Sequence, residues 1–128
     1  MILFLDTSTP VCKLSFADGD WRYEATWESG RGLAKGLLEY LETELSSQGK
    51  SWSDVTGLAI YKGPGSFTGL RIGITVMNTL ADANRWPIVG TTGDDWQLVA
   101  AKRLEAGETD GIVMPEYGGE ANITTPRK

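Results

Sequence analysis

The hydrophobic pattern of this sequence first changes from strand-like to helical near residue 33, and that change limits which folds the chain can adopt. Residues 2–7 begin with four consecutive apolar side chains, residues 11–17 alternate between apolar and polar, and residues 21–28 continue as an aromatic-rich extended segment. A continuous apolar run is typical of a buried strand, and alternation is typical of a half-buried one. With a hairpin turn at Asp18-Gly19-Asp20, the first 28 residues predict a β-meander.

From Leu33 onward, apolar residues recur at the spacing of one helix face, which predicts a helix from residue 33 to about residue 47. The expected elements after it are a strand, a helix, a short strand and a last helix, at 56–62, 68–84, 87–90 and 95–106. A meander followed by alternating strands and helices predicts an α/β fold with a mixed sheet and the order β-β-β-α-β-α-β-α. We expect one domain over residues 1–107 and a short C-terminal tail over residues 108–128.

The composition excludes several kinds of chemistry. The 128 residues contain no histidine and a single cysteine, Cys12, which we expect to be a small core residue. They can therefore supply no histidine base, no His-ligated metal and no intrachain disulfide, and we expect no metal site. The formal net charge of −5 argues against a large nucleic-acid-binding surface. With no membrane-spanning segment or signal peptide recognisable in the sequence, we expect a cytoplasmic protein without membrane contact.

A glycine-rich segment, residues 63–73, joins the expected strand at 56–62 to the apolar helix that follows it. Backbone N–H groups and the helix dipole at such a turn can hold an anion. The glycine spacing is neither that of a Walker loop nor that of a dinucleotide-binding fingerprint. Two interpretations stay open: a phosphate contact, or a tight turn whose glycines let the helix approach the sheet closely.

The same segment carries a resemblance to a known family. Its sequence, GPGSFTGLRIG, agrees at eleven consecutive positions with the signature of the bacterial TsaB (YeaZ) proteins. Residues 2–9 resemble the family's opening I-L-A-L-D-T motif, residues 86–90 resemble its short I-P-V-V-G strand, and residues 114–117 resemble the P-x-Y near its C-terminus. The resemblance covers about residues 1–105, so we expect the family's second actin-like domain to be missing or reduced to a remnant.

The resemblance implies an actin-like ATPase domain (ASKHA, ribonuclease H-like). It also implies a role in making threonylcarbamoyladenosine at adenosine 37 of tRNA. In this family catalysis belongs to the paralogue TsaD, which holds a metal through histidines, and a chain without histidine fits a non-catalytic subunit. TsaB pairs with TsaD through helices of its N-terminal domain, and the ATPase TsaE binds the pair. The resemblance therefore implies TsaD-type and TsaE-type partners, with tRNA reached only through the complex.

The helices at 33–47 and 68–84 are the expected partner surface. The second is apolar on nearly every side, more than a sheet alone can cover, so we expect a partner to bury part of it. Gly36 and Gly73 are expected to allow close approach of the helices. The alternatives are that these residues only cover the sheet, or that the same helices form a homodimer. The predicted contacts are Leu33, Gly36, Leu37, Tyr40, Ile72, Gly73, Val76, Met77 and Leu80.

The turn after the first strand is a second candidate site, because in actin-like ATPases this turn handles phosphate and metal. The alternative is a capped turn after a buried strand. Arg71 opens a helix, where a cation is unfavourable, so we expect a carboxylate or phosphate partner for it, unless it is simply solvated. The candidate phosphate or nucleotide contacts are Asp6, Thr7, Ser8, Gly65, Ser66 and Arg71.

We expect no resident cofactor, and ATP or ADP bound at the partner interface is left open. Two other functional classes are also left open. One is a small nucleotide-binding enzyme that uses the glycine-rich turn. The other is a general interaction module, unrelated to tRNA, that pairs with itself.

Overall fold

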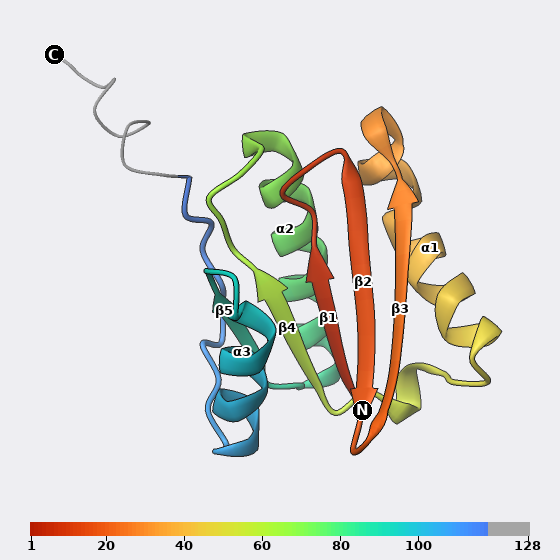
Figure 1. The fold of residues 1–128 in the computed structure, drawn as a ribbon, viewed down its shortest axis with the longest axis vertical. Helices are drawn as coiled ribbons and strands as arrows, with labels where there is room; N and C mark the ends of the chain where they lie inside the picture. The colour runs from red at the N-terminus through yellow and green to blue at the C-terminus, as the bar shows by residue number, and fades with distance from the viewer. Residues whose placement is uncertain (118–128) are drawn as a thin grey trace, which may run out of the picture.

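One mixed sheet of five strands organises residues 1–117, the part of the chain that the computed structural model describes (Figure 1). The strand order is β3-β2-β1-β4-β5, with β1 in the centre. β1 pairs antiparallel with β2 and parallel with β4, and β4 pairs parallel with β5. The elements are β1 (Ile2–Asp6), β2 (Val11–Asp18), β3 (Trp21–Glu28), α1 (Leu33–Ser47), β4 (Gly57–Tyr61), α2 (Phe67–Asn84), β5 (Ile88–Thr91) and α3 (Trp96–Glu105).

The predicted fold class and element order are confirmed. Each predicted boundary lies within one or two residues of the observed one, and two short 3₁₀ turns lie at Gly30–Gly32 and Trp52–Asp54. The second turn begins with a capping box between Ser51 and Asp54, which satisfies backbone N–H groups at both residues. No helix among residues 1–117 is both long enough and apolar enough to cross a membrane.

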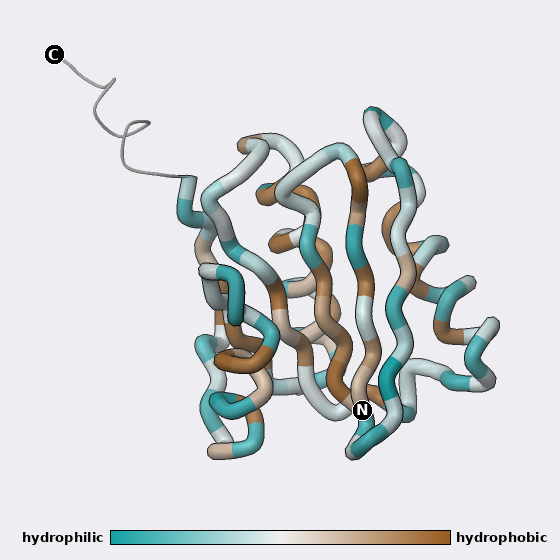
Figure 2. The backbone as a smooth tube through the Cα atoms, in the orientation of Figure 1, coloured by the Kyte–Doolittle hydropathy of each residue, from teal (hydrophilic) through white to brown (hydrophobic). Residues whose placement is uncertain are grey.

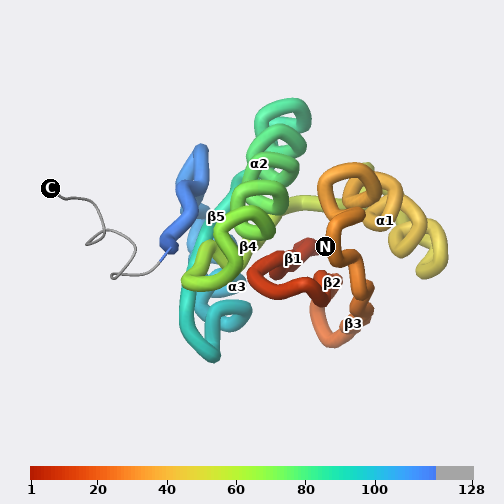
Figure 3. Tube along the Cα trace, turned by 90° about the horizontal axis from the view of Figure 1, so that it is seen from above, coloured from red at the N-terminus to blue at the C-terminus, as the bar shows by residue number. Residues whose placement is uncertain are grey.

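The helices form a layer on each face of the sheet. α1 and α2 cover one face and α3 covers the other, over β4 and β5 (Figure 3). Because side chains alternate along a strand, β1 serves both layers: Leu3 and Leu5 enter the core under α1 and α2, and Phe4 enters the smaller core with Ala100 of α3. The hydropathy colouring shows the apolar residues concentrated on the central strands and the inner helix faces (Figure 2).

Strand β2 gives the half-buried alternation that its sequence predicts, except at Ser15, which is buried as well. Cys12, Leu14 and Phe16 are fully or almost fully buried, while Lys13 is exposed. Cys12 is therefore a small core residue, as expected. Burial raises the pKa of its thiol to about 12, and the nearby Asp6 carboxylate adds to the effect. A thiol with such a pKa stays protonated and unreactive at neutral pH.

Residues 109–117, here called the strap, pack against the sheet. Gly107 ends α3 with a φ of +82°, and the chain then turns back along β5. The Asp110 N–H donates to the Ile88 carbonyl oxygen at 2.7 Å, and the Glu116 N–H donates to the Lys62 carbonyl oxygen at 2.7 Å. The domain boundary expected at residue 107 therefore separates α3 from a segment that is hydrogen-bonded to β5 and to Lys62, the residue after β4. Residues 118–128 of the expected tail lie outside the described part of the chain.

Candidate functional site

The glycine-rich turn packs directly on the turn between β1 and β2. The Thr7 hydroxyl donates to the Gly69 carbonyl oxygen at 2.7 Å, and the Ser66 N–H donates to the Ser8 carbonyl oxygen at 2.8 Å. A Cβ atom at residue 65 would lie 2.5 Å from the Ser8 Cβ, and one at residue 69 would overlap the Thr7 carbonyl oxygen. Gly65 and Gly69 are therefore required by close contact between the start of α2 and the β1–β2 turn, while a Cβ at Gly63 would overlap the Glu116 carbonyl oxygen.

The β1–β2 turn is itself capped from within. Thr7 is completely buried, and the Ser8 N–H donates to the Asp6 carboxylate at 2.8 Å. Ser66 caps α2, because its hydroxyl accepts from the Gly69 N–H at 3.3 Å. These contacts match the second interpretation of each turn, a capped and close-packed junction. Binding of a phosphate or nucleotide at the same residues stays a prediction.

Arg71 has an aromatic neighbour, and an anionic partner for it stays a prediction. Its guanidinium carbon lies 5.3 Å from the centre of the Phe67 ring, a geometry in which the ring face attracts the cation. Phe67 is 55% exposed, although it is a large apolar residue in the first turn of α2. Phe67 also contacts Tyr117 at the end of the strap, and the centres of the two rings lie 4.5 Å apart.

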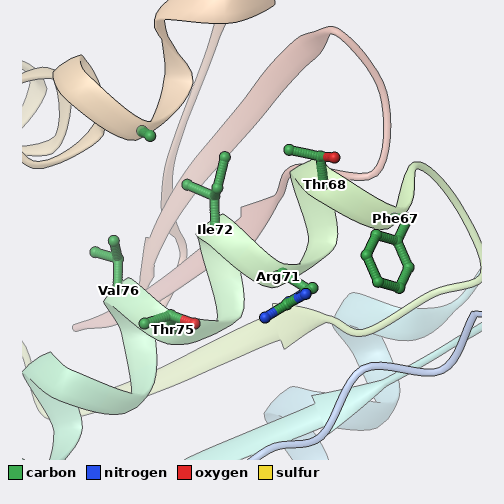
Figure 4. A pocket seen from close by; sticks show the side chains of 7 residues that line it. Phe67, Thr68, Arg71, Ile72, Thr75 and Val76 are labelled. Atoms are coloured by element: carbon green, nitrogen blue, oxygen red, sulfur yellow. The ribbon is translucent and has the colours of Figure 1, made fainter.

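A groove of about 420 Å³ opens between the beginning of α1 and the outer face of α2 (Figure 4). We call it the α1–α2 groove. It is lined by Ala34, Phe67, Thr68, Arg71, Ile72, Thr75 and Val76. A neighbouring hollow of about 350 Å³ shares Thr68 and Ile72 with it and extends to Pro10 and Arg31, near the start of α1. The result is a largely apolar surface with one cation among the side chains that line the α1–α2 groove.

The structure divides the predicted partner contacts into two groups. Ile72 and Val76 line the α1–α2 groove, and Leu80 is half-buried further along the same helix. Four others lie inside the chain's own core as it is folded here, which corrects their assignment to a partner surface. These four are Leu33, Leu37, Gly73 and Met77, of which Leu33 also lines the neighbouring hollow.

The two helix glycines make their close approach to the sheet side of the domain. A Cβ at residue 36 would meet the Trp27 ring of β3 at 3.0 Å, and one at residue 73 would overlap the Thr7 side chain. Both glycines therefore let a helix approach the sheet or its turns, and neither is found where α1 meets α2. Gly36 is the half-buried one of the two.

Tyr40 lies beneath β3. Its ring centre is 4.9 Å from that of Trp27, and its hydroxyl is buried without a hydrogen-bond partner among the described residues. Burial raises the pKa of this hydroxyl, with smaller contributions from Cys12, Glu44 and Tyr23. Tyr40 thus belongs to the packing between α1 and the sheet.

Sequence reasoning missed several residues of the α1–α2 groove: Ala34, Phe67, Thr68 and Thr75. Phe67 carried a usable signal, because a large apolar residue in the first turn of a helix, beside a glycine-rich turn, has few places to be buried. Within residues 1–117, no group of three or more His, Cys, Asp or Glu side chains could hold a metal ion.

The fold is an actin-like (ASKHA) α/β domain, with a five-stranded mixed sheet between helices. The family model described as "TsaD: tRNA N6-adenosine threonylcarbamoyltransferase" matches residues 28–110. The TsaB protein of Escherichia coli (strain K12), described as a tRNA threonylcarbamoyladenosine biosynthesis protein, is 35% identical over 92 residues, which are 71% of this chain and 39% of the relative. The protein of the same description in Haemophilus influenzae is 31% identical over 84% of this chain and 45% of the relative.

A solved structure is similar as well. YeaZ from Pseudomonas aeruginosa superposes with a TM-score of 0.68 and 32% identity, over 83% of this chain and 49% of that one. A more distant relative, 27% identical, is a tRNA N6-adenosine threonylcarbamoyltransferase of Syntrophus aciditrophicus. The chain belongs to the family that the matching model describes and, within it, to the TsaB (YeaZ) group. It spans 39–49% of the length of these TsaB and YeaZ relatives.

Proposed function

We propose that this chain is a non-catalytic subunit in the biosynthesis of threonylcarbamoyladenosine on tRNA, and that a TsaD-type catalytic subunit docks in its α1–α2 groove. The observation that carries the proposal is the groove itself. It exposes Phe67 and leaves Ile72 and Val76 only half-buried, on the helix that bears the family signature. An apolar groove of this kind is typical of a protein interaction surface.

The chemistry of the chain supports an accessory role. The 128 residues contain no histidine, so a metal held by histidines would have to come from another subunit. The net charge of −5 favours contact with tRNA through the assembled complex over direct binding to its phosphates. The proposal includes a TsaE-type ATPase as a further partner, ATP or ADP at the subunit interface, and a cytoplasmic location.

Titration calorimetry with a purified TsaD-type subunit tests the docking surface. Val76→Arg places a charged side chain in the α1–α2 groove and is expected to weaken binding at least about tenfold, because an arginine buried against apolar surface must find a partner or lose its hydration. Threonylcarbamoyladenosine formation in the reconstituted system should fall with it. The matched control is Thr43→Arg, which adds the same charge on an exposed position of α1 outside the groove.

The outcomes separate the alternatives. Wild-type binding that Val76→Arg leaves unchanged would exclude this groove as the docking surface. A wild-type chain that forms dimers by light scattering, loses them with Val76→Arg and never binds the TsaD-type subunit would support a self-pairing module instead. Tight binding of ATP by the chain alone would support a small nucleotide-binding enzyme.

A further inference from the structure

The strap is fixed to α2 at its middle. Val113 is 3% exposed, and its backbone makes two hydrogen bonds with the side chain of Asn78 on α2. The Val113 N–H donates to Asn78 Oδ1 at 2.9 Å, and Asn78 Nδ2 donates to the Val113 carbonyl oxygen at 3.0 Å. A Cβ at residue 90 would overlap the Val113 side chain, so Gly90 leaves the space that this residue fills. The strap therefore has one defined position along α2.

Beyond Val113, the strap reaches the rim of the α1–α2 groove. Tyr117 stacks on Phe67 at 4.5 Å between ring centres, with the rings tilted by 34°. The guanidinium carbon of Arg71 in turn lies over the Phe67 ring, 5.3 Å from its centre. Arg71 and Thr75 line the α1–α2 groove on one side and the hollow between α2 and the strap on the other. One continuous row of side chains thus connects the strap to the groove.

Arg71 is the residue through which this row of side chains can affect the binding of a partner. It is the one charged side chain among the seven residues that line the α1–α2 groove, and it is exposed. A mobile arginine loses rotamer freedom when a partner fixes it, and a side chain that is already held in place loses less. An exposed guanidinium beside an apolar groove is complementary to a carboxylate on the docked partner.

We propose that Tyr117 is a positioning residue for docking: it holds Phe67, and through Phe67 it holds Arg71 ready to bind an acidic side chain of the partner. This inference rests on the proposed function, because it concerns the same groove. It adds that the strap, which the sequence alone places in a short tail, forms part of the docking site.

A double-mutant cycle with Arg71 tests the proposal. Tyr117→Ala is expected to weaken binding of the TsaD-type subunit about fivefold, the size of effect expected when one long side chain must be ordered on binding. Tyr117→Phe keeps the ring and should restore wild-type affinity. In an Arg71→Ala background, Tyr117→Ala should have little further effect, because both changes remove the same contact. The control is Ile112→Ala, on a strap side chain that is 68% exposed.

Nuclear magnetic resonance of the free chain supplies a readout that does not need the partner. The Arg71 side-chain protons lie over the Phe67 ring and should show a ring-current shift that Tyr117→Ala reduces and Tyr117→Phe preserves. Equal affinities for Tyr117→Ala and wild type, or effects that add to those of Arg71→Ala, would overturn the positioning role. If wild type does not bind the TsaD-type subunit at all, the proposed function fails, while the ring-current shift still tests the coupling of Tyr117 to Arg71.

Discussion

The two long sides of α2 differ in how completely the rest of the chain buries them. On the side that meets the β1–β2 turn, Gly69 and Gly73 press against Thr7 with no room for a single added carbon. On the other side, Ile72 and Val76 face a groove of about 420 Å³. The smallest residues of the family signature thus mark the contact that builds the domain, and larger apolar residues on the same helix mark the surface that it leaves open.

Neighbouring residues on α2 therefore have opposite roles, and substitutions on the two sides should fail in different ways. Met77 is fully buried, and Val76, the residue before it, lines the groove. A change on the inner side should lower the free energy of unfolding and remove binding only because the domain is lost. A change on the groove side should leave the domain folded and remove binding directly.

The largest expected effect is that of Met77→Asp. The new carboxylate would lie in the core without a partner, and the methionine packing would be lost, so we expect the free energy of unfolding to fall by about 5 kcal/mol or more. Urea unfolding followed by tryptophan fluorescence measures it. The matched control is Val76→Asp, for which we expect a loss of about 1 kcal/mol. Similar losses for the two variants would contradict the division of α2 into a core side and a groove side.

Gly69→Ala is expected to have the next largest effect. The added methyl group would overlap the Thr7 carbonyl oxygen, and the Thr7 hydroxyl would have to leave the Gly69 carbonyl that it now donates to. Overpacking at a rigid backbone contact costs about 3 kcal/mol, measurable as a lower midpoint of thermal unfolding. Gly32→Ala is the control, because nothing lies within 4 Å of a Cβ there, and it should change stability by less than about 1 kcal/mol. A stable Gly69→Ala variant would mean that the close contact is not needed.

The sequence was sufficient to predict the strands and helices, but not to predict which side of each helix faces the sheet. The alternation around Leu14 and the helical spacing after Leu33 carry enough period to locate strands and helices. α2 is different, because its apolar residues extend beyond the side that faces the sheet, although the exposed Arg71, Thr75 and Asp82 share the opposite side. Met77 and Val76 could not be told apart for that reason.

The strap shows the same limit more strongly. Its short apolar piece around Val113 is visible in the sequence, yet its position depends on the space over Gly90 and on the Asn78 side chain, both of which are distant along the chain. Only the assembled sheet brings these residues together. Tyr117 could therefore be recognised as part of a family motif but not as a neighbour of Phe67.

The contact between the strap and β5 is polar. A substitution there should have the smallest effect on the free energy of unfolding. The Asp110 carboxylate accepts from the Gly90 N–H at 2.8 Å and from Arg103 Nη2 at 2.5 Å. Burial raises the pKa of the Asp110 carboxyl, but the hydrogen bonds from Arg103 and Gly90 outweigh it, so the pKa lies below its ordinary value of 3.8. The ionised form is therefore the one that the fold favours.

The sign of the pH dependence follows from that shift. The stabilisation is fully present above about pH 3.8 and is lost as the pH falls through the lower pKa of the folded state. Asp110→Asn should lower the free energy of unfolding at pH 7 by about 1–2 kcal/mol, and should lose less than wild type does between pH 7 and pH 3 in urea titrations. Glu108→Gln is the control, because Glu108 binds the same arginine but is 53% exposed. Equal losses of stability at low pH for wild type and Asp110→Asn would show that this contact does not hold the strap on β5.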